Sequence, residues 1–356
     1  MMRASRMMRA VALLAVVTGC DVVWRVDHFD HATPPNYAYR KRIVVTQLAS
    51  TALDNYPLAI VRSTDADLAL HADPSGGDLV FFDADGNVLD REITQFGPAG
   101  ELEAWVRLPR LQPGTTELYL AYGGPPIASG PEAVWSTFAG AWHMADATVE
   151  RDLTGHGHGL VPQTKTPGSG AGVVGAARAF DGATMFCAGA GEPTLDFGTG
   201  SFSYSAWVNL IDAVDMYDQP LYKGGASVDD PGYDFELGND VWHAVVSDTT
   251  GKSAEASLDD GVFGSWGYLG AVVDRDQHTF YTYWNGLFDH MVDITAIGSL
   301  DSTELLCVGG PHFVHGLVDE IRVFSTHVPD AWFATEFQNF SDPTHFIEFG
   351  AEEPTP

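Results

Sequence analysis

The sequence has few basic residues and few cysteines, and it has no long apolar run after its N-terminal segment. Its 18 Lys and Arg are outnumbered by 48 Asp and Glu among 356 residues, which gives a net charge of −30. Such a charge repels nucleic acid and anionic surfaces, so we expect no nucleic-acid partner. After residue 20 no stretch is long and apolar enough to predict a membrane-spanning helix. Apolar residues still make up 45% of the chain, which predicts a folded protein.

Common catalytic motifs are missing as well. The chain contains no HExxH, GxSxG or Walker sequence. Asp234 and Glu236 alternate onto one strand face and, with Asp319 and Glu320, come nearest to the paired carboxylates that a glycoside hydrolase needs. Neither pair shows the clustered acidic motif of such enzymes. We therefore expect a protein that is not an enzyme, with hydrolysis as the alternative.

The first twenty residues have the pattern of an export signal. Arg3, Arg6 and Arg9 accompany a short apolar run that ends in Val17-Thr18-Gly19-Cys20. The run is too short to span a bilayer permanently, so it predicts a cleaved secretory signal. Its ending resembles the lipobox of bacterial lipoproteins. The resemblance implies cleavage before Cys20 and a lipid anchor on its thiol. It also implies a place in the bacterial cell envelope, facing the periplasm or the cell surface. Residues 21–36 then read as a polar tether.

With Cys20 assigned to the lipid, two cysteines remain. An even remainder in an oxidising compartment favours a disulfide between Cys187 and Cys307. Two separate buried thiols are the alternative.

Residues 37–126 contain short apolar and alternating runs that predict a small β-sandwich. The runs are 42–45, 56–61, 78–82, 103–108 and 116–122, with an Asp-Gly turn at 85–86. The segments FFDADGNVLDREI, AWVRLP and LYLAYGG resemble an uncharacterised bacterial domain that is associated with MotA/TolQ/ExbB-type proton-channel proteins. The resemblance implies an extracytoplasmic β-domain with no catalytic residue.

Residues 134–349 are predicted to form a second, larger sandwich. Segments 141–144, 152–159, 175–182, 202–208, 280–288 and 316–324 resemble, in order, the laminin G-like family of concanavalin A-like lectin and glucanase folds. The resemblance implies a two-sheet jelly roll, which the short strands and Gly/Pro-rich turns independently favour. Asn285-Gly286 predicts a type I′ hairpin turn. Residues 329–340 predict a C-terminal helix whose aromatic residues pack, and 344–350 predict a last strand. The predicted fold class is all-β.

Laminin G-like modules frequently hold a structural calcium ion. The resemblance makes Asp152 and Asp319 the leading carboxylate ligands for Ca2+, with Asp146 behind them. The alternative is that these aspartates cap turns.

Sugar recognition needs exposed aromatic faces beside polar groups. Candidates in or beside predicted loops are Tyr217, Tyr222, Trp242, Trp266 and Tyr268. We expect an envelope-anchored lipoprotein that binds carbohydrate or an envelope protein through its second sandwich. A glycoside hydrolase, or a structural component of a TolQ/ExbB-type complex, is the alternative.

Overall fold

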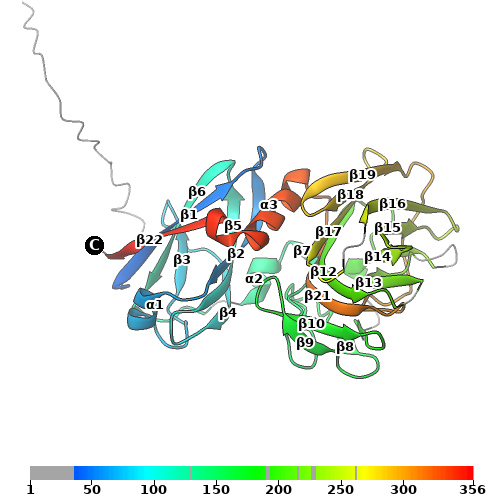
Figure 1. The fold of residues 1–356 in the computed structure, drawn as a ribbon. Coiled ribbons are helices and arrows are strands. Elements are labelled where there is room, and N and C mark those ends of the chain that lie inside the picture. The colour runs from blue at the N-terminus through cyan, green and yellow to red at the C-terminus, as the bar shows by residue number, and fades with distance from the viewer. Residues whose placement is uncertain are drawn as a thin grey trace, which may run out of the picture.

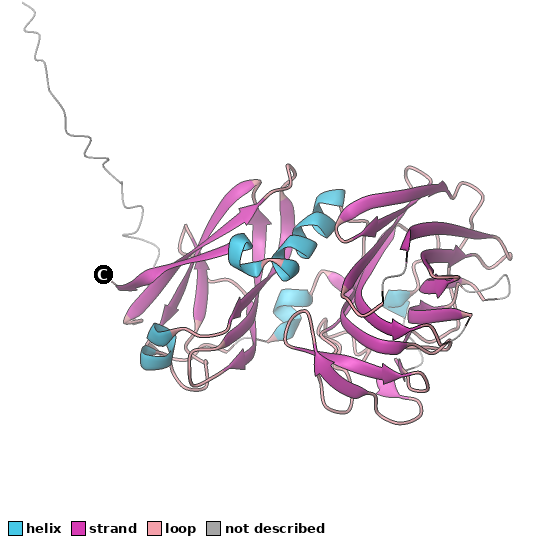
Figure 2. Cartoon of the chain, viewed as in Figure 1, coloured by secondary structure: helices cyan, strands magenta, loops and turns pink. Residues whose placement is uncertain are grey.

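The computed structural model describes residues 36–355, apart from 129, 190–192, 215, 226–229 and 261–262. The predicted signal, Cys20 and nearly all of the tether lie outside this part of the chain. Figure 2 shows that strands dominate, with a few short helices. The strands of the described residues pair antiparallel in four sheets, which form two sandwiches (Figure 1). The predicted all-β fold is confirmed. None of the described helices has the length and apolar character needed to span a membrane.

The first sandwich uses residues from both ends of the described chain. Its larger sheet has the order β22-β1-β6-β3 and its smaller sheet the order β2-β5-β4. The larger sheet contains β1 (Tyr39–Gln47), β3 (Val80–Asp83), β6 (Gly114–Tyr122) and β22 (Ile347–Pro354). The smaller sheet contains β2 (Leu53–Arg62), β4 (Arg91–Phe96) and β5 (Leu102–Leu111). Each of the five predicted strands in this region overlaps an observed one.

A short helix in this sandwich was not expected from the sequence. α1 (Ala66–His71) begins at Asp65, whose Oδ1 accepts hydrogen bonds from the amides of Asp67 at 3.1 Å and Leu68 at 3.2 Å. The buried Lys41 ammonium lies 2.6 Å from the same oxygen. Six residues are too few to show a helical stripe, so the signal was only the capping aspartate.

The second sandwich consists of two larger sheets. One has the order β19-β18-β17-β12-β21-β10-β9, with β7 also paired to β21, and the other has the order β16-β15-β14-β13-β20-β11-β8. The first of these contains β7 (Phe138–Trp142), β9 (Gly168–Ala171), β10 (Ala176–Asp181), β12 (Phe202–Asp212), β17 (Gly267–Asp274), β18 (Thr279–Trp284), β19 (Leu287–Asp293) and β21 (His315–Phe324). The second contains β8 (Val161–Pro162), β11 (Phe186–Cys187), β13 (Tyr217–Lys223), β14 (Gly232–Gly238), β15 (Val241–Ser247), β16 (Ser253–Asp260) and β20 (Cys307–Val308). A 3-10 turn, η2 (Pro193–Leu195), lies beside them.

The predicted hairpin turn between β18 and β19 is confirmed. Asn285 and Gly286 have φ values of 50° and 80°, the positive values that a type I′ turn requires at both positions.

The two sandwiches share a core at the place where they meet. Figure 1 shows α2 (Pro131–Trp135) and α3 (Asp330–Ser341) between the two groups of strands. In α3, Trp332 contacts Tyr56 of β2, with ring centroids 5.3 Å apart, and Phe333 stacks on Tyr283 of β18 at 4.3 Å. The predicted C-terminal helix and the packing role of its aromatic residues are confirmed.

A buried charged network crosses the same boundary. His143 places its two ring nitrogens 3.0 Å from Glu320 of β21 and 3.3 Å from Glu92 of β4. Arg322 lies 2.8 Å from both Glu320 and Glu336 of α3. Residues from both sandwiches and from α3 therefore satisfy one another's charges in the shared interior.

The last strand lies in a different place from the one we expected. The sequence grouped it with the second sandwich, whereas β22 follows α4 (Pro343–Phe346) and pairs with β1 at the edge of the first sandwich. Its side chains explain the placement: Glu352 Oε2 accepts a hydrogen bond from Tyr122 at 2.7 Å and lies 2.8 Å from His71. Strand pairing over such a distance in sequence leaves no local signal.

Candidate functional site

The two outer faces of the second sandwich differ in what covers them. α3 covers the sheet that contains β17 and β18, where Tyr268, Val272 and Tyr283 share one buried core with the first sandwich. Gly270 allows this close approach, because a Cβ there would lie 2.4 Å from the Phe333 ring. The outer face of the other sheet has no such helix among the described residues. We therefore place the candidate site on the β13–β16 sheet.

Strict alternation along β14 gives this sheet one apolar and one polar face. Phe235 points inward, with its ring centroid 4.6 Å from that of Tyr204 in β12, and Tyr233 and Leu237 belong to the same core. Asp234 and Glu236 take the opposite face, because successive strand side chains point to opposite sides. The structure confirms that these two carboxyl groups share one face.

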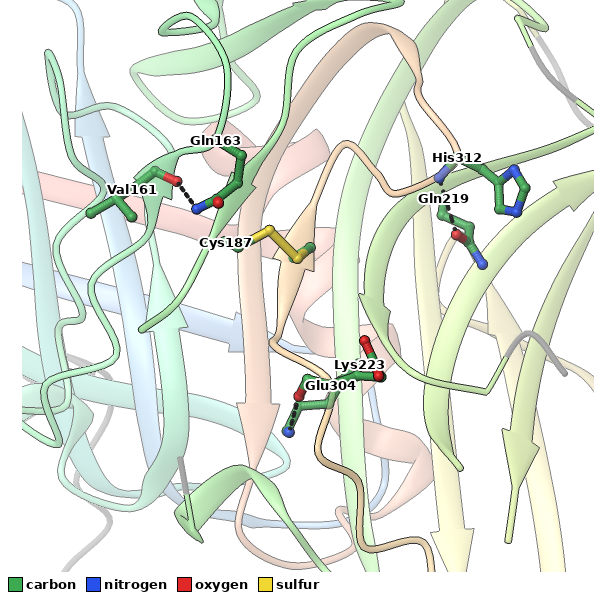
Figure 3. The surroundings of a disulfide bond; sticks show 8 residues. Val161, Gln163, Cys187, Gln219, Lys223, Glu304 and His312 are labelled. Atoms are coloured by element: carbon green, nitrogen blue, oxygen red, sulfur yellow. Dashed lines mark hydrogen bonds between the residues drawn. A yellow bond between two sulfur atoms is a disulfide. The ribbon is translucent and has the colours of Figure 1, made fainter. Parts of the chain in front are cut away.

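The predicted disulfide is present and belongs to the same outer face. Cys187 of β11 is bonded to Cys307 of β20, its cross-strand partner (Figure 3). The register continues across the sheet from Cys307 to Tyr222, Asp234 and Val245. The disulfide therefore fixes one end of a row of residues whose other end reaches the cavity described next.

A cavity of about 380 Å³ opens on this face. We call it the outer-face cavity. It is lined by Tyr217, Gly225, Glu236, Gly238, Asn239, His243, Val245, Ser247, Ser253 and Glu255. Among the described residues, the lining contains two carboxylates, one imidazole, one amide and three hydroxyl groups, one of them the phenol of Tyr217, but no Lys or Arg. In the described lining, Tyr217 supplies the one phenyl-type ring.

Glu236 is the most unusual group in this lining. Its side chain is only 7% exposed, and within the described residues it has no hydrogen bond or ion pair. Burial and the negative charge of Glu255 raise its pKa to about 7, although His312 opposes them. A carboxyl group buried without a partner is costly in a protein, and it is ready to bind a donor from a ligand.

Asp234 lies two residues before Glu236 on the same face of β14 and is fully buried. Its Oδ2 accepts a hydrogen bond from Gln219 Nε2 at 2.8 Å, while its Oδ1 has no partner among the described residues. Burial and the charge of Glu236 raise its pKa well above the ordinary value. Gln219 is held by the backbone of His312, whose amide donates to its Oε1 at 3.3 Å (Figure 3).

Two further contacts shape the cavity. His243 Nδ1 lies 2.8 Å from Glu255 Oε1, so this carboxylate already has a neighbour that can balance its charge. The Tyr217 ring lies over Gly238, where an added Cβ would come within 3.0 Å of two ring carbons. Glycine at this position therefore leaves room for the aromatic ring beside Glu236.

Hydrogen bonds hold two further lining residues, Gly225 and Ser247, in place. Ser247 donates a hydrogen bond to the Gly225 carbonyl at 2.9 Å, and Gly225 N donates to Asp230 O at 2.7 Å. The Tyr222 hydroxyl also donates to the Asp230 carboxylate. The end of β13 and the start of β14 are thus tied across the outer face.

The aromatic residues predicted to bind sugar are not brought together. Tyr217, which is 36% exposed, lines the cavity. Tyr222 is 7% exposed and packs against the disulfide. Trp242 is 2% exposed in the core, and Tyr268 is fully buried under α3, so neither presents a face to a ligand. Trp266 is half-buried and packs against the core that the two sandwiches share, away from the cavity lining.

Of the aspartates predicted to bind calcium, Asp146 and Asp152 line one cavity, whose described lining does not include Asp319. No group of three or more His, Cys, Asp or Glu residues in the described part of the chain is arranged to hold a metal ion. Asp152 instead accepts four hydrogen bonds, two from Thr154 and two from the amides of Gly157 and His158. These bonds are those of the turn-capping alternative.

Asp319 and Asp146 are likewise bonded to backbone amides. Asp319 Oδ2 accepts from Val173 N at 2.7 Å, and Asp146 Oδ2 accepts from Arg151 N at 2.9 Å. Asp319 and Glu320, the second candidate acid pair, have different partners. Glu320 bonds to His143 and Arg322 at the boundary between the sandwiches, whereas Asp319 bonds to the backbone of Val173.

Sequence reasoning missed His243 and Glu255. The usable signal was the hairpin at 232–247, where Asn239 and Asp240 both have positive φ and set Glu236 opposite His243. Glu255 follows from the next pairing, in which it faces Val245.

No protein-family model and no curated protein matches this chain. Among solved structures, the binding domain of Paraclostridial Mosquitocidal Protein 1 aligns with TM-score 0.48 and 11% identity, covering 58% of this chain and 53% of that one. The receptor-binding domain of botulinum neurotoxin mosaic serotype C/D aligns with TM-score 0.47 and 9% identity, covering 57% and 51%. The botulinum neurotoxin serotype D binding domain gives TM-score 0.45 and 9% identity, over 57% and 51%. The chain thus spans about half the length of these structures.

Proposed function

We propose that the protein binds carbohydrate in the outer-face cavity and does not catalyse a reaction of it. The observation that carries this proposal is Glu236, a nearly buried carboxyl group that lines the cavity without any described partner, beside the exposed ring of Tyr217. Ligand sites in proteins combine an apolar contact surface with a few well-placed polar groups.

The chemistry of the lining suits a sugar. A pyranose ring presents C–H groups on its face, which pack on an aromatic ring, and hydroxyl groups at its edge. Tyr217 supplies the ring. Glu236 and Glu255 accept hydrogen bonds, and Asn239, His243 and the two serines can both donate and accept. A cavity of about 380 Å³ lies in the usual range for small-ligand sites.

The proposal includes a location in the bacterial cell envelope. It rests on the N-terminal signal and on Cys20, whose sequence context resembles a lipobox. The disulfide supports this location, because disulfides form and persist in oxidising compartments. Intact-mass measurement of the purified protein tests this part: acylation of Cys20 and loss of the residues before it are the expected result.

A glycan array tests the binding. We would screen residues 21–356, which contain all of the described fold, and measure the affinity of the best glycan. Tyr217→Ala should weaken that affinity about tenfold, because the aromatic contact is lost. Leu287→Ala, an exposed apolar position on the edge strand β19, is the matched control and should bind as the wild type does. Equal affinity of the two variants would remove the cavity from the account.

Hydrolysis is the second candidate, and one observation favours it. Burial and Glu255 give Glu236 a pKa of about 7, which suits a general acid. Asp234 shares its strand face, but it is fully buried and bonded to Gln219. Release of reducing ends from a bound glycan, lost in Glu236→Gln, would replace the binding proposal with a hydrolase.

A further inference from the structure

We infer that the outer-face cavity selects glycans that carry a free amine, of the glucosamine type, over neutral and acidic glycans. This inference rests on the proposed function, because it specifies which carbohydrate the same cavity takes. Three features of the described residues carry it: the charge of the lining, the state of Glu236 and the position of Tyr217.

The charge of the lining is one-sided. Among the described lining residues, Glu236 and Glu255 are acidic and none is Lys or Arg. The one imidazole of the described lining, His243, already lies 2.8 Å from Glu255, so a ligand carboxylate or sulfate would find no unpaired cationic side chain in that lining and would be repelled. The net charge of −30 over the whole chain acts in the same direction at longer range. Acidic glycans are therefore disfavoured.

Glu236 and Glu255 differ in whether a described side chain balances their charge. Glu255 has the His243 imidazole 2.8 Å away and is largely exposed. Glu236 is more than nine-tenths buried, lines the cavity and has no described hydrogen bond. Its raised pKa shows the cost of holding that charge without a partner. A cation from the ligand would balance the charge of this carboxylate, whereas a neutral hydroxyl group would only donate a hydrogen bond to it.

An ammonium group is the best match for such a carboxylate. It donates charge-assisted hydrogen bonds, which are roughly twice as strong as neutral ones. The Tyr217 ring lies over Gly238, next to Glu236 on β14, and an aromatic face near the carboxylate adds a cation–π contact. A metal ion fits less well, because no group of three metal-ligating side chains occurs in the described part of the chain.

The test compares two oligosaccharides that differ only in acetylation. Glucosamine tetramer and N-acetylglucosamine tetramer would be titrated calorimetrically into residues 21–356 at pH 7 and 150 mM salt. We expect the wild type to prefer the free amine about tenfold or more. Glu236→Gln should weaken binding of the glucosamine tetramer at least about tenfold more than binding of the acetylated tetramer, so that the preference is lost. Glu348→Gln, which removes an exposed charge on β22 of the first sandwich, should keep it.

The outcomes separate the two proposals. Equal binding of both tetramers, or tighter binding of the acetylated one, would overturn the amine inference and leave carbohydrate binding intact. Binding of neither tetramer overturns the inference, and if the array also gives no glycan the proposed function fails with it. A trilysine peptide is the third ligand. If the peptide binds as tightly as the glucosamine tetramer does, the cavity selects positive charge and not an amino sugar, and the inference is overturned.

Discussion

Glu236 is the residue on which the binding proposal depends most, because it combines burial, a place in the cavity and the lack of a described partner. Alternation in the Asp234-Phe235-Glu236 segment was enough to place both acids on one strand face. The same rule, applied to β15, would have placed Trp242 inside, since it alternates with the outward-facing His243 and Val245. Tyr268 was beyond such reasoning, because a helix from the far end of the chain covers it.

The raised pKa of Glu236 predicts that Glu236→Gln stabilises the free protein at alkaline pH. On folding, this pKa rises from 4.5 to about 7, so the folded state loses stability as the pH increases through that interval. Above pH 7 the full penalty is present, up to about 3 kcal/mol, and the glutamine variant lacks it. Urea unfolding at pH 4 and pH 8 measures the difference. The two proteins should differ at pH 8 and converge at pH 4, and equal stability at both would contradict the assigned environment.

At the scale of elements, the disulfide and the C-terminal segment show what sequence can and cannot supply. The even number of cysteines after Cys20, with export expected from the N-terminal pattern, favoured the Cys187–Cys307 bond over two separate thiols, and the bond is present. The register that puts this bridge in the same row as Tyr222 and Asp234 needed the structure, because β11 and β20 are only two residues long. The helix α3 was predictable from its spacing, but the partner of β22 was not.

Removing the bridge should destabilise the second sandwich. The Cys187→Ser/Cys307→Ser variant frees a loop of 120 residues in the unfolded chain, so we expect a loss of about 2 to 4 kcal/mol. The urea midpoint of the variant, compared with that of the reduced and oxidised wild type, measures this loss. The reduced wild type should behave like the variant. A change below about 0.5 kcal/mol would show that the bridge does not constrain the chain.

Deleting residues 347–356 should destabilise the first sandwich. The deletion removes β22, leaves the edge of β1 unpaired and takes away the Glu352 carboxylate that bonds to Tyr122. Since each lost backbone hydrogen bond costs about 1 kcal/mol, we expect a loss of at least about 3 kcal/mol in urea unfolding followed by tryptophan fluorescence. Glu348→Gln keeps the strand and should be neutral. An unchanged midpoint would mean that β22 contributes nothing to the sandwich.

At the scale of the whole molecule, the two sandwiches form one unit with a shared core and are not independent domains. α3 packs its aromatic residues on both, and the network of Glu92, His143, Glu320 and Arg322 crosses between them. In this arrangement no described helix covers the outer face of the β13–β16 sheet. Nothing local in the sequence shows that one sheet is covered and the other is free, although both have apolar strands.

The boundary network predicts a loss of stability in alkali. Burial lowers the pKa of His143, but Glu320 and Glu92 outweigh it and raise the pKa to about 10, above the ordinary 6.5. Its stabilising contribution is therefore complete below pH 6.5 and is lost as the pH rises through 10. The wild type should lose up to about 1.4 kcal/mol per pH unit in this interval. His143→Gln should lose less, and parallel curves for the two proteins would show that His143 is not held protonated.

Backbone hydrogen exchange with and without the best-bound glycan tests the central claim most directly, because it locates the ligand on the folded chain. We predict slower exchange at 217–219 and along the 236–245 hairpin, which supply Tyr217, Glu236 and His243 to the cavity. Protection confined to other parts of the chain, such as the 146–159 loop or the first sandwich, would contradict the account.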